Sequence, residues 1–417
     1  MSEHAAQAAQ LDTVAHLALL LGRILLVNGS DTEQVQLSVV RFAKAFDADA
    51  NLLVTYEAVL VTLAGGGQIR TKIGHRVPGM GVGMTAIAAA NRLVDDACAG
   101  RLRLDEVQAA LDAIEHGVST YAPWLVAAAL GVTAGCLSRL FGGDLLACLA
   151  AGLAGGVGAW MRLQFVSRHV NPVVTVFVVA LLSGIVGGAA VRLAVSSTPT
   201  LPLIAPAMIL VPGVPLINGI LDMIRNHVTI GMSRLGFAAL IVLAIALGLF
   251  GATQLTKVVV PVNSPASTIG VVEDALFSAL AAGGFALSFN VPPRMAWACG
   301  VCGVASHSLR TLLYHLGVDL IAGTLIGALV MGFLAQILAH RFRAPAVALA
   351  FPGVVAMIPG SYAFRAVFGI LQVAQGVATT ATVTETLSLL ATAGLMVGAI
   401  AVGVAAPALL IPPRHSE

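Results

Sequence analysis

The chain has 417 residues, of which 58% are hydrophobic and only 10% are charged, and its mean hydropathy is +0.94. This composition excludes a soluble globular protein, because such proteins do not bury so large an apolar fraction. The formal net charge of +2 is small, and we expect no nucleic-acid partner.

The acidic residues are concentrated near the N-terminus, where thirteen of the twenty precede residue 121. We therefore divide the chain into an N-terminal α+β domain, residues 1–120, and a membrane body that follows. The first residues, MSEHAAQAAQLDTVAH, carry no basic segment and no cleavage site ahead of an apolar core. This is not the pattern of a secretory signal, so we expect the N-terminal domain to lie in the cytosol.

The N-terminal domain is predicted to contain four helices and two strands. Apolar spacing predicts helices near residues 11–27, 30–46, 85–98 and 105–115, and β-rich composition predicts strands over 52–63 and 68–73. Ser30 and Glu33 have the spacing of a capping box, with the Ser30 hydroxyl as the N-cap of the second helix. No Walker A motif is present, so the sequence does not support direct drive by ATP.

From residue 122 onward, ten hydrophobic segments are long enough to cross a bilayer. They lie near residues 122–141, 144–161, 172–194, 201–221, 233–251, 270–289, 294–313, 318–340, 345–364 and 386–410. With a cytosolic N-terminal domain, the cytosolic loops and the tail carry eight arginines, including Arg225 and Arg234, against five basic residues on the other side. This bias favours an α-helical polytopic membrane protein with both termini in the cytosol.

The membrane body contains an internal repeat. A shift of 148 residues superposes Phe141 on Phe289 and Arg162 on Arg310. After a short insertion the shift becomes 140 residues and places Pro212-Gly213 on Pro352-Gly353. Residues 121–255 and 256–417 then form two repeats of five spans each, and the odd number turns the second repeat upside down in the membrane. Such inverted repeats are an architecture of secondary transporters.

Two of the ten segments contain helix-breaking residues at corresponding places. The fourth carries Pro212-Gly213 and Asn218-Gly219, and the ninth carries Pro352-Gly353 and Pro359-Gly360. A break frees backbone groups that lipid cannot satisfy, so it persists where a cavity, water or a substrate satisfies them. Matched breaks indicate a midplane binding site, and half-helix ends suit the carboxylate and ammonium groups of an amino acid. The alternative is a proline kink that neighbouring helices close.

Three sets of residues resemble the threonine/serine exporter family. They are Gly29-Ser30-Asp31-Thr32-Glu33-Gln34-Val35; Pro212-Gly213 with Leu216, Asn218-Gly219 and Asp222; and Phe289-Asn290-Val291-Pro292-Pro293-Arg294 with Phe351-Pro352-Gly353 and Ile358-Pro359-Gly360-Ser361-Tyr362. The resemblance covers nearly the whole chain in the same order. It implies a bacterial inner-membrane protein with a cytosolic N-terminal region and about ten spans, which exports threonine and serine with the proton-motive force. Some family members divide these halves between two proteins, whereas this chain carries both.

The candidate site residues lie in and beside the broken segments. For substrate binding they are Pro212, Gly213, Asn218, Gly219, Gly353, Gly360, Ser361 and Tyr362. Asp222 and Asp319 are the candidates for carrying the coupling proton, because carboxylates inside a membrane are usually functional. Two alternatives stay open: Asp222 ends its span at the cytosolic surface, and Asp319 only begins a helix.

Other reactive residues of the body are expected to have structural roles. Glu273 and Asp274 begin a span, where acidic residues stabilise a helix N-terminus. His307 is predicted to be a helix-face residue rather than a ligand. For Arg310 and Arg162 the role of an interfacial anchor is left open. Cys299 and Cys302 form a CxxC inside an apolar helix without a second pair, so packing explains them better than redox or metal chemistry.

These features favour a secondary active transporter for small neutral hydroxy amino acids over an enzyme. An aspartyl intramembrane protease is disfavoured because the GxGD spacing and a partner aspartate are missing, and HExxH and GxSxG motifs are also missing. A channel, or a carrier for another small polar solute, is the alternative. We expect threonine or serine, protons and the lipid bilayer as partners, no cofactor and no metal; a homo-oligomer is left open.

Overall fold

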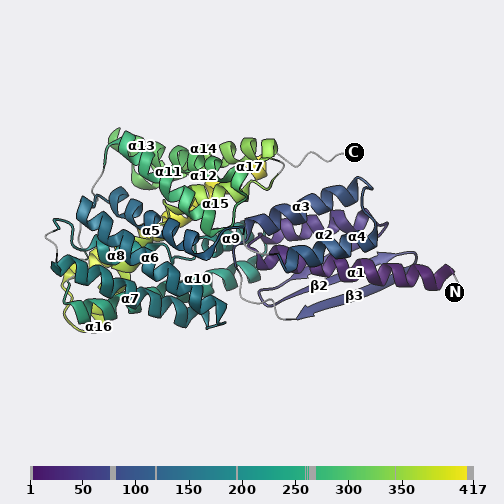
Figure 1. The fold of residues 1–417 in the computed structure, drawn as a ribbon, viewed down its shortest axis with the longest axis horizontal. Coiled ribbons are helices and arrows are strands. Elements are labelled where there is room, and N and C mark those ends of the chain that lie inside the picture. Colours follow the sequence, from purple (N-terminus) through teal and green to yellow (C-terminus); the bar gives the residue numbers. More distant parts are fainter. Residues whose placement is uncertain are drawn as a thin grey trace.

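The computed structural model describes residues 3–75, 81–117, 120–193, 196–258, 260, 262, 269–342 and 344–410. These residues are mostly helical and form two parts that lie next to each other along the longest axis of the molecule (Figure 1). The part containing residues 3–116 is called the head below, and the part containing residues 123–410 is called the body.

The head packs helices against a small antiparallel sheet. α1 (Glu3–Val27) lies on the strands β2 (Ala58–Gly65) and β3 (Gln68–His75), and β1 (Asp49–Val54) pairs with the other edge of β2. Val59, Val61 and Leu63 of β2 are buried, as the two-residue period of a strand with one covered face requires. The head is completed by α2 (Thr32–Lys44), α3 (Met84–Cys98) and α4 (Leu104–Glu115).

Two local predictions for the head are wrong. Residues 52–63 are not one strand, because the Thr55 N–H donates to the Ala58 carbonyl at 2.9 Å and closes a turn between β1 and β2. The N-cap of α2 is Asp31 and not Ser30, since the Asp31 carboxylate accepts a hydrogen bond from the Gln34 N–H at 3.0 Å. Carboxylates cap helices as well as hydroxyls do, and the fully buried Ser30 side chain is left for another role.

α1 shows that apolarity alone does not define a membrane span. Its segment Gln7–Val27 is long and apolar enough to cross a bilayer. Leu17, Leu21 and Leu25 are nevertheless completely buried within the protein, and the helix packs on β2 and β3. The apolar surface of α1 is therefore used for the core of the head.

The body is built from long apolar helices. They are α5 (Pro123–Leu140), α6 (Leu145–Ser167), α7 (Pro172–Leu193), α10 (Val228–Thr256), α11 (Val271–Ser288), α14 (Leu320–Phe342) and α17 (Thr380–Leu410). Together with α1 the described residues contain 8 candidate spans, or up to 10 if each of two bent helix pairs is one span. The chain is therefore a multi-pass membrane protein.

Within the described residues of the body, three segments are interrupted helices. α8 (Leu201–Met208) and α9 (Gly213–Ile224) meet at 54°, and α15 (Val347–Val355) and α16 (Gly360–Ala374) meet at 52°. α12 (Pro293–Gly303) continues through a π-helical turn, η1 (Val304–Ser308), into α13 (Leu309–His315). Each of the ten segments found from hydropathy corresponds to one long helix or to one interrupted helix.

The elements of the body recur at a nearly constant spacing. α11, α12 and α14 begin 148 residues after α5, α6 and α7. α9 and α16 begin at Gly213 and Gly360, 147 residues apart, and each has a proline as its N-cap. The predicted match of Pro212-Gly213 with Pro352-Gly353 is therefore wrong, because Pro352 lies inside α15 as Pro206 lies inside α8.

Small residues allow the helices of the body to approach closely. A Cβ atom on Gly131 of α5 would lie 2.9 Å from the Gly152 carbonyl of α6, and one on Gly332 of α14 would lie 2.7 Å from the Gly403 carbonyl of α17. Lipid supplies no hydrophobic driving force between helices, so such close contacts are a main source of their association.

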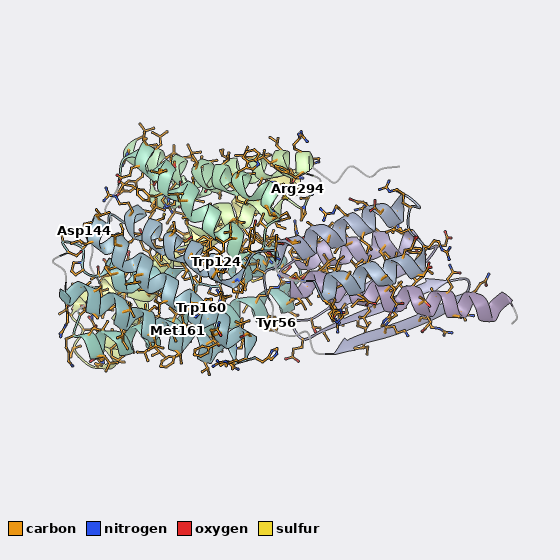
Figure 2. All side chains as sticks on the ribbon, in the orientation of Figure 1. Tyr56, Trp124, Asp144, Trp160, Met161 and Arg294 are labelled. Carbon is orange, nitrogen blue, oxygen red and sulfur yellow. The ribbon has the colours of Figure 1, made fainter. Side chains whose placement is uncertain are left out.

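The two ends of the body differ in their side chains. The exposed residues Trp124 and Trp160 lie toward the head, whereas Asp144 lies at the opposite end (Figure 2). Trp297, also exposed, lies near the start of α12. Tryptophan is enriched where a bilayer meets water, so we read the end of the body near the head as one membrane interface.

Candidate functional site

The two helix breaks meet inside the body. A Cβ atom on Gly213, the first residue of α9, would overlap the Ile358 side chain, which precedes α16. A Cβ atom on Gly360, the first residue of α16, would lie 3.1 Å from the Val211 side chain. Side chains of one break thus fill the space that the other glycine leaves open. The structure brings together Pro212, Gly213 and Gly360 as the sequence predicts.

The other predicted binding residues lie apart from this crossing. Gly353 packs inside α15, where a Cβ atom would lie 2.7 Å from the Cβ atom of Cys302. Gly219 lies against Leu235 of α10. Ser361 is buried next to Gly360, and Tyr362 packs on a small cluster that contains Ala366. The predicted set is therefore divided among several places. Cys299 and Cys302 are free and buried.

Asn218 and Asp222 lie on one face of α9 and contact the head. The Asn218 side-chain amide donates to the Gly29 carbonyl at 2.8 Å. The Asp222 carboxylate accepts a hydrogen bond from the Thr32 N–H at 3.0 Å. The first and second sets of residues that resemble the exporter family therefore meet in space, although they are about 190 positions apart. The contact region of the 29–33 turn with α9 and α10 is called the junction below.

Arg234 of α10 completes a buried ion pair at the junction. Its Nε lies 3.3 Å from the Asp222 carboxylate, and the two side chains are 1% and 0% exposed. Its Nη2 also donates to the Ser30 carbonyl at 2.9 Å. Asp222 lies near the end of α9, but the head covers it completely, so it is not a solvent-exposed helix end. Sequence reasoning missed Arg234 by counting it among loop charges, although apolar residues surround it in the sequence.

Arg225 holds the outer rim of the junction. It contacts the Asp31 carboxylate at 2.8 Å and the Glu33 carboxylate at 2.6 Å. Asp31 also caps α2, so the helix cap and the contact between head and body depend on the same carboxylate. This arrangement fixes the 29–33 turn against α9.

The junction also holds buried polar atoms that have no hydrogen-bond partner in the described part of the chain. They include Ser30 Oγ and Asn218 Oδ1. Buried polar groups are nearly always paired, and exceptions mark a bound water, ion or ligand or a strained site. Ser30 belongs to the turn whose carbonyl binds Arg234, and Asn218 lies one helical turn before Asp222 on α9. The Asp222 carboxylate attracts an ammonium group, and the Arg234 guanidinium attracts a carboxylate. The arrangement suits a small zwitterion that carries a hydroxyl group.

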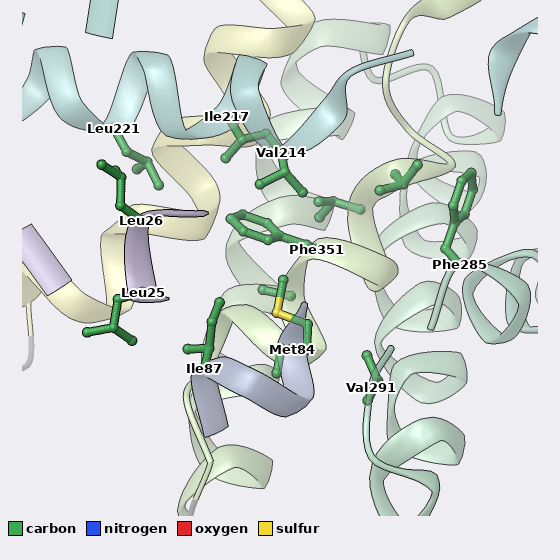
Figure 3. Close-up of a cluster of buried hydrophobic side chains, with 14 of the residues drawn as sticks. Leu25, Leu26, Met84, Ile87, Val214, Ile217, Leu221, Phe285, Val291 and Phe351 are labelled. Atoms are coloured by element: carbon green, nitrogen blue, oxygen red, sulfur yellow. The ribbon is translucent and has the colours of Figure 1, made fainter. Parts of the chain in front are cut away.

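A second contact joins the head to the other half of the body. The N–H groups of Met84 and Thr85 donate to the carbonyls of Phe289 and Asn290 at 2.9 and 3.0 Å, and the Tyr121 hydroxyl donates to the Val291 carbonyl at 2.8 Å. An apolar cluster lies between the two contacts, where Phe351 is surrounded by Met84, Ile87 and Val214 (Figure 3). The head therefore contacts both halves of the body at once.

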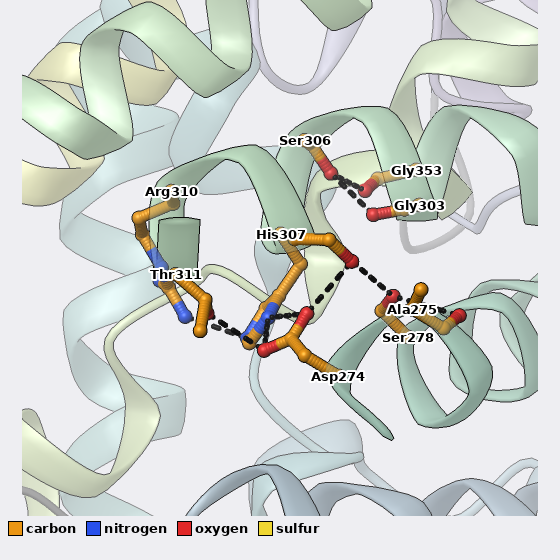
Figure 4. A network of polar contacts seen from close by, with 10 residues as sticks. Asp274, Ala275, Ser278, Gly303, Ser306, His307, Arg310, Thr311 and Gly353 are labelled. Carbon is orange, nitrogen blue, oxygen red and sulfur yellow. Dashed lines mark hydrogen bonds and ion pairs between the residues drawn. The ribbon is translucent and has the colours of Figure 1, made fainter. Parts of the chain in front are cut away.

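A second group of buried ionisable residues lies within the body (Figure 4). The Asp274 carboxylate is 2.8 Å from His307 Nδ1, and it accepts hydrogen bonds from Ser308 Oγ at 2.9 Å and Thr311 Oγ1 at 2.7 Å. The other ring nitrogen of His307 is 2.6 Å from Arg310 Nη2. These five residues are called the outer network below.

The outer network corrects two predictions and decides the role left open for Arg310. Asp274 does not cap α11, because its side chain binds residues of η1 and α13. His307 is a buried partner of Asp274 and not a simple helix-face residue, and Arg310 is only 9% exposed and therefore is not an interfacial anchor. Asp274 lies 33 residues before His307 in the sequence, and no motif has this spacing. The sequence therefore did not predict their contact.

Asp319 and Glu273 occupy simpler positions. Asp319 is exposed, and its carboxylate accepts hydrogen bonds from the N–H groups of Ile321 and Ala322 at the start of α14. These bonds are those of a helix cap. Glu273 forms an ion pair with Arg139 of α5. Asp319 does not join Asp222 in one site.

Two family models match the chain. The model described as "Putative threonine/serine exporter" matches residues 16–256, and the model described as "Threonine/Serine exporter, ThrE" matches residues 274–410. The boundary between the two matches falls between α10 and α11, where the spacing of elements begins to recur.

Curated relatives cover one half or nearly the whole of the chain. A "Threonine/serine exporter" of Corynebacterium glutamicum is 21% identical over 93% of this chain and 82% of its own length. A "Probable threonine/serine exporter" of Mycobacterium tuberculosis is 24% identical over 85% and 69%. A "Probable succinate transporter subunit YjjP" of Escherichia coli is 26% identical over 58% and 94%. No solved structure matches the chain. From the two family models together, the chain belongs to the threonine/serine exporter family.

Proposed function

We propose that the protein is a secondary active transporter that exports threonine and serine, driven by the proton-motive force across a bacterial inner membrane. The observation that carries this proposal is the junction, where the buried Asp222–Arg234 pair is covered by the 29–33 turn, and where Ser30 Oγ and Asn218 Oδ1 have no hydrogen-bond partner among the described residues. Membership of the exporter family and the names of the relatives in Corynebacterium and Mycobacterium support the same direction and substrate class.

The substrate binds at the junction by replacing contacts that exist within the protein. Its ammonium group forms an ion pair with the Asp222 carboxylate, and its carboxylate forms an ion pair with the Arg234 guanidinium. Its hydroxyl group bonds to the Asn218 amide and to the Ser30 or Thr32 hydroxyl, which can both donate and accept. A neutral zwitterion leaves the net charge of the site unchanged. A substrate without a hydroxyl group leaves some of these buried groups unpaired and binds more weakly.

The head acts as the inner gate of this site. Because the 29–33 turn covers Asp222 and Arg234, a solute from the cytosol reaches them only when the turn separates from α9. The head is a separate α+β domain, residues 1–120, and both termini are cytosolic. Loss of the Asp222 charge weakens its bonds to Thr32 and Arg234, so protonation of Asp222 links proton movement to the gate.

The two halves of the body form inverted repeats, and their relative movement opens the binding site to one side of the membrane at a time. The crossing of Gly213 with Ile358 and of Gly360 with Val211 is packed, so solute passes only if the two broken helices separate. Pro212, Pro359 and the neighbouring Ser361 and Tyr362 lie on this path. Reporter fusions test the topology: a fusion after α14 reads as cytosolic, and one in the loop between α16 and α17 reads as external.

Counterflow in proteoliposomes tests the transport activity of the full chain. Vesicles loaded with unlabelled threonine should accumulate labelled threonine, and serine should compete. In a carrier, unlabelled solute inside the vesicles stimulates the uptake of labelled solute from outside, whereas a channel shows no such stimulation. Succinate belongs in the panel because of the relative named as a succinate transporter subunit. If counterflow is seen with succinate and not with threonine or serine, the substrate is a dicarboxylate and not a hydroxy amino acid.

A further inference from the structure

The outer network lies at the end of the body opposite to the head. Asp274 is in the first turn of α11, and the last turn of the same helix leads into Phe289, whose carbonyl binds the head. The junction and the outer network are therefore separated by most of the membrane thickness. Buried ionisable groups within membrane helices are costly and usually serve ion or proton movement.

The hydrogen bonds determine the proton positions in the outer network. Arginine can only donate, so the His307 Nε2 that faces Arg310 must be the acceptor. The single ring proton is then on Nδ1, which donates to the Asp274 carboxylate at 2.8 Å. The triad holds one negative carboxylate, one neutral imidazole and one positive guanidinium. Its net charge is zero, which is the state that a low-dielectric site favours.

We propose that the outer network is the site that binds the coupling proton from the external side, at His307 Nε2. This inference rests on the proposed function and adds to it a second titrating site. A proton can occupy Nε2 only if Arg310 moves away, because the lone pair is used by the Arg310 hydrogen bond and two cations repel each other. Proton binding therefore displaces Arg310 and the start of α13.

The displacement is transmitted to the broken ninth segment. Ser306, in the same π-helical turn as His307, donates to the Gly353 carbonyl of α15 at 2.7 Å. Gly353 also lies against Cys302, where a Cβ atom would be 2.7 Å from the cysteine Cβ. α15 leads directly into the break before Gly360. π-helical turns are frequent at functional sites, and this one connects the titrating histidine to the crossing of the two breaks.

The neighbouring charges are paired among themselves. Glu273 on α11 pairs with Arg139 of α5, and Arg365 of α16 pairs with Glu385 of α17. Tyr362 of α16 lies within electrostatic range of Arg310. Since the charged neighbours on these elements have partners of opposite sign, the proton acceptor that faces a movable cation is His307.

The first half of the body shows that the helix packing does not require this network. At the positions 148 residues earlier, Val126 replaces Asp274 and Ala159 replaces His307, while Arg162 corresponds to Arg310. The corresponding helix, α6, is a continuous α-helix with no π-helical turn. The carboxylate, the imidazole and the π-helical turn therefore occur together in one half.

The test uses the full-length protein in proteoliposomes and the variants His307→Gln and Asp274→Asn. At equal pH on both sides, threonine counterflow should persist in both variants. Accumulation driven by an imposed pH gradient should fall by an order of magnitude or more. His315→Gln is the matched control, because His315 ends the same helical segment and is exposed; it should keep both activities.

The outcomes separate this inference from the proposed function. Wild-type protein without counterflow of any amino acid would contradict the proposed function. With active wild-type protein, a His307→Gln variant that still accumulates threonine with unchanged pH dependence would overturn the proton site. A folded variant that loses counterflow as well would assign His307 a structural role and would also overturn it. If Asp274→Asn does not fold, nitrogen-15 NMR of histidine in the wild-type protein decides: Nε2 of His307 should gain a proton on acidification, and a resonance that does not titrate would refute the site.

Discussion

The two halves of the body have the same order of helices but place their buried charges at opposite ends. In the first half the Asp222–Arg234 pair lies next to the head; in the second half Asp274 and His307 lie at the other end. At the positions in the second half that correspond to Asp222 and Arg234 by element spacing, Gly369 packs against Thr386. The close packing of helices can be repeated, whereas each ionisable site is present once.

This difference separates the features that the helix packing requires from those that we assign to transport. Prolines at the N-caps of α9 and α16 and glycines at the helix crossings occur in both halves, so the fold requires them. A buried charge is expensive in a membrane. One buried pair lies where the 29–33 turn docks on α9 and α10, and the other lies beside η1, the π-helical turn of the described residues. Substitutions made in one half at a time test this difference between the two halves.

The largest effect on stability is expected when one partner of the Asp222–Arg234 pair is removed. Asp222→Ala or Arg234→Ala leaves a buried unpaired ion and should lower the free energy of unfolding by about 3–5 kcal/mol. Arg41→Ala is the matched control, since its partner Asp95 is exposed; the loss should stay below about 1 kcal/mol. Denaturant unfolding of the purified protein measures both. Equal losses would show that the junction is not energetically distinct from a surface pair.

The next effect concerns the glycines where the two breaks cross. Gly213→Ala should destabilise the protein by about 1–3 kcal/mol through overpacking against Ile358. Gly360→Ala should cost less, because Val211 lies 3.1 Å from the added atom and has to move by only a few tenths of an ångström. Gly283→Ala is the control, with no atom near the added methyl group, and should be neutral or stabilising. A neutral Gly213→Ala would mean that the two broken helices do not cross as described.

A smaller effect is expected on solute affinity at the junction. Asn218→Ala removes an amide that contacts the head and that we place against the substrate hydroxyl. The affinity for serine and threonine should fall by about 1 kcal/mol, roughly fivefold. Asn171→Ala, which removes a helix-capping amide at the start of α7, is the control and should leave affinity unchanged. Isothermal titration or a thermal-shift panel measures the difference; equal affinity in both variants would move the binding site away from α9.

An effect of similar size, but on stability, is expected at the loop before α6. Asp144 accepts hydrogen bonds from the Ala147 N–H and from Ser196 and Ser197, and the Ala147 bond is the main cause that lowers its pKa to about 2. A lowered pKa adds stability above the unfolded-state value and loses it as the pH falls from about 4 toward 2. Asp144→Ala should cost about 1 kcal/mol at neutral pH and flatten the acid limb of the unfolding profile. An unchanged acid limb would contradict this cap.

The sequence predicted the membrane class, the ten segments and the broken pair because hydropathy and proline–glycine pairs act locally. It predicted Asn218 and Asp222 as neighbours on one helix face for the same reason. It could not show that Thr32 binds Asp222 or that Arg234 faces it, because those contacts depend on how the head docks. The π-helical turn and the pairing of Asp274 with His307 also depend on tertiary packing, since single-residue propensities do not encode them.

The contact of the head with both halves has a consequence for assembly. α1 through α10 include the head and the first half. The second half packs on the first through α11 against α5 and α17 against α9, and its carbonyls at residues 289–291 also bind Met84, Thr85 and Tyr121 of the N-terminal part. If the chain is cut between α10 and α11, these bonds become a recognition surface between two polypeptides. The cut protein should therefore behave as a heterodimer: the co-expressed pieces should purify together, and replacing Thr85 by a bulky residue should weaken their association.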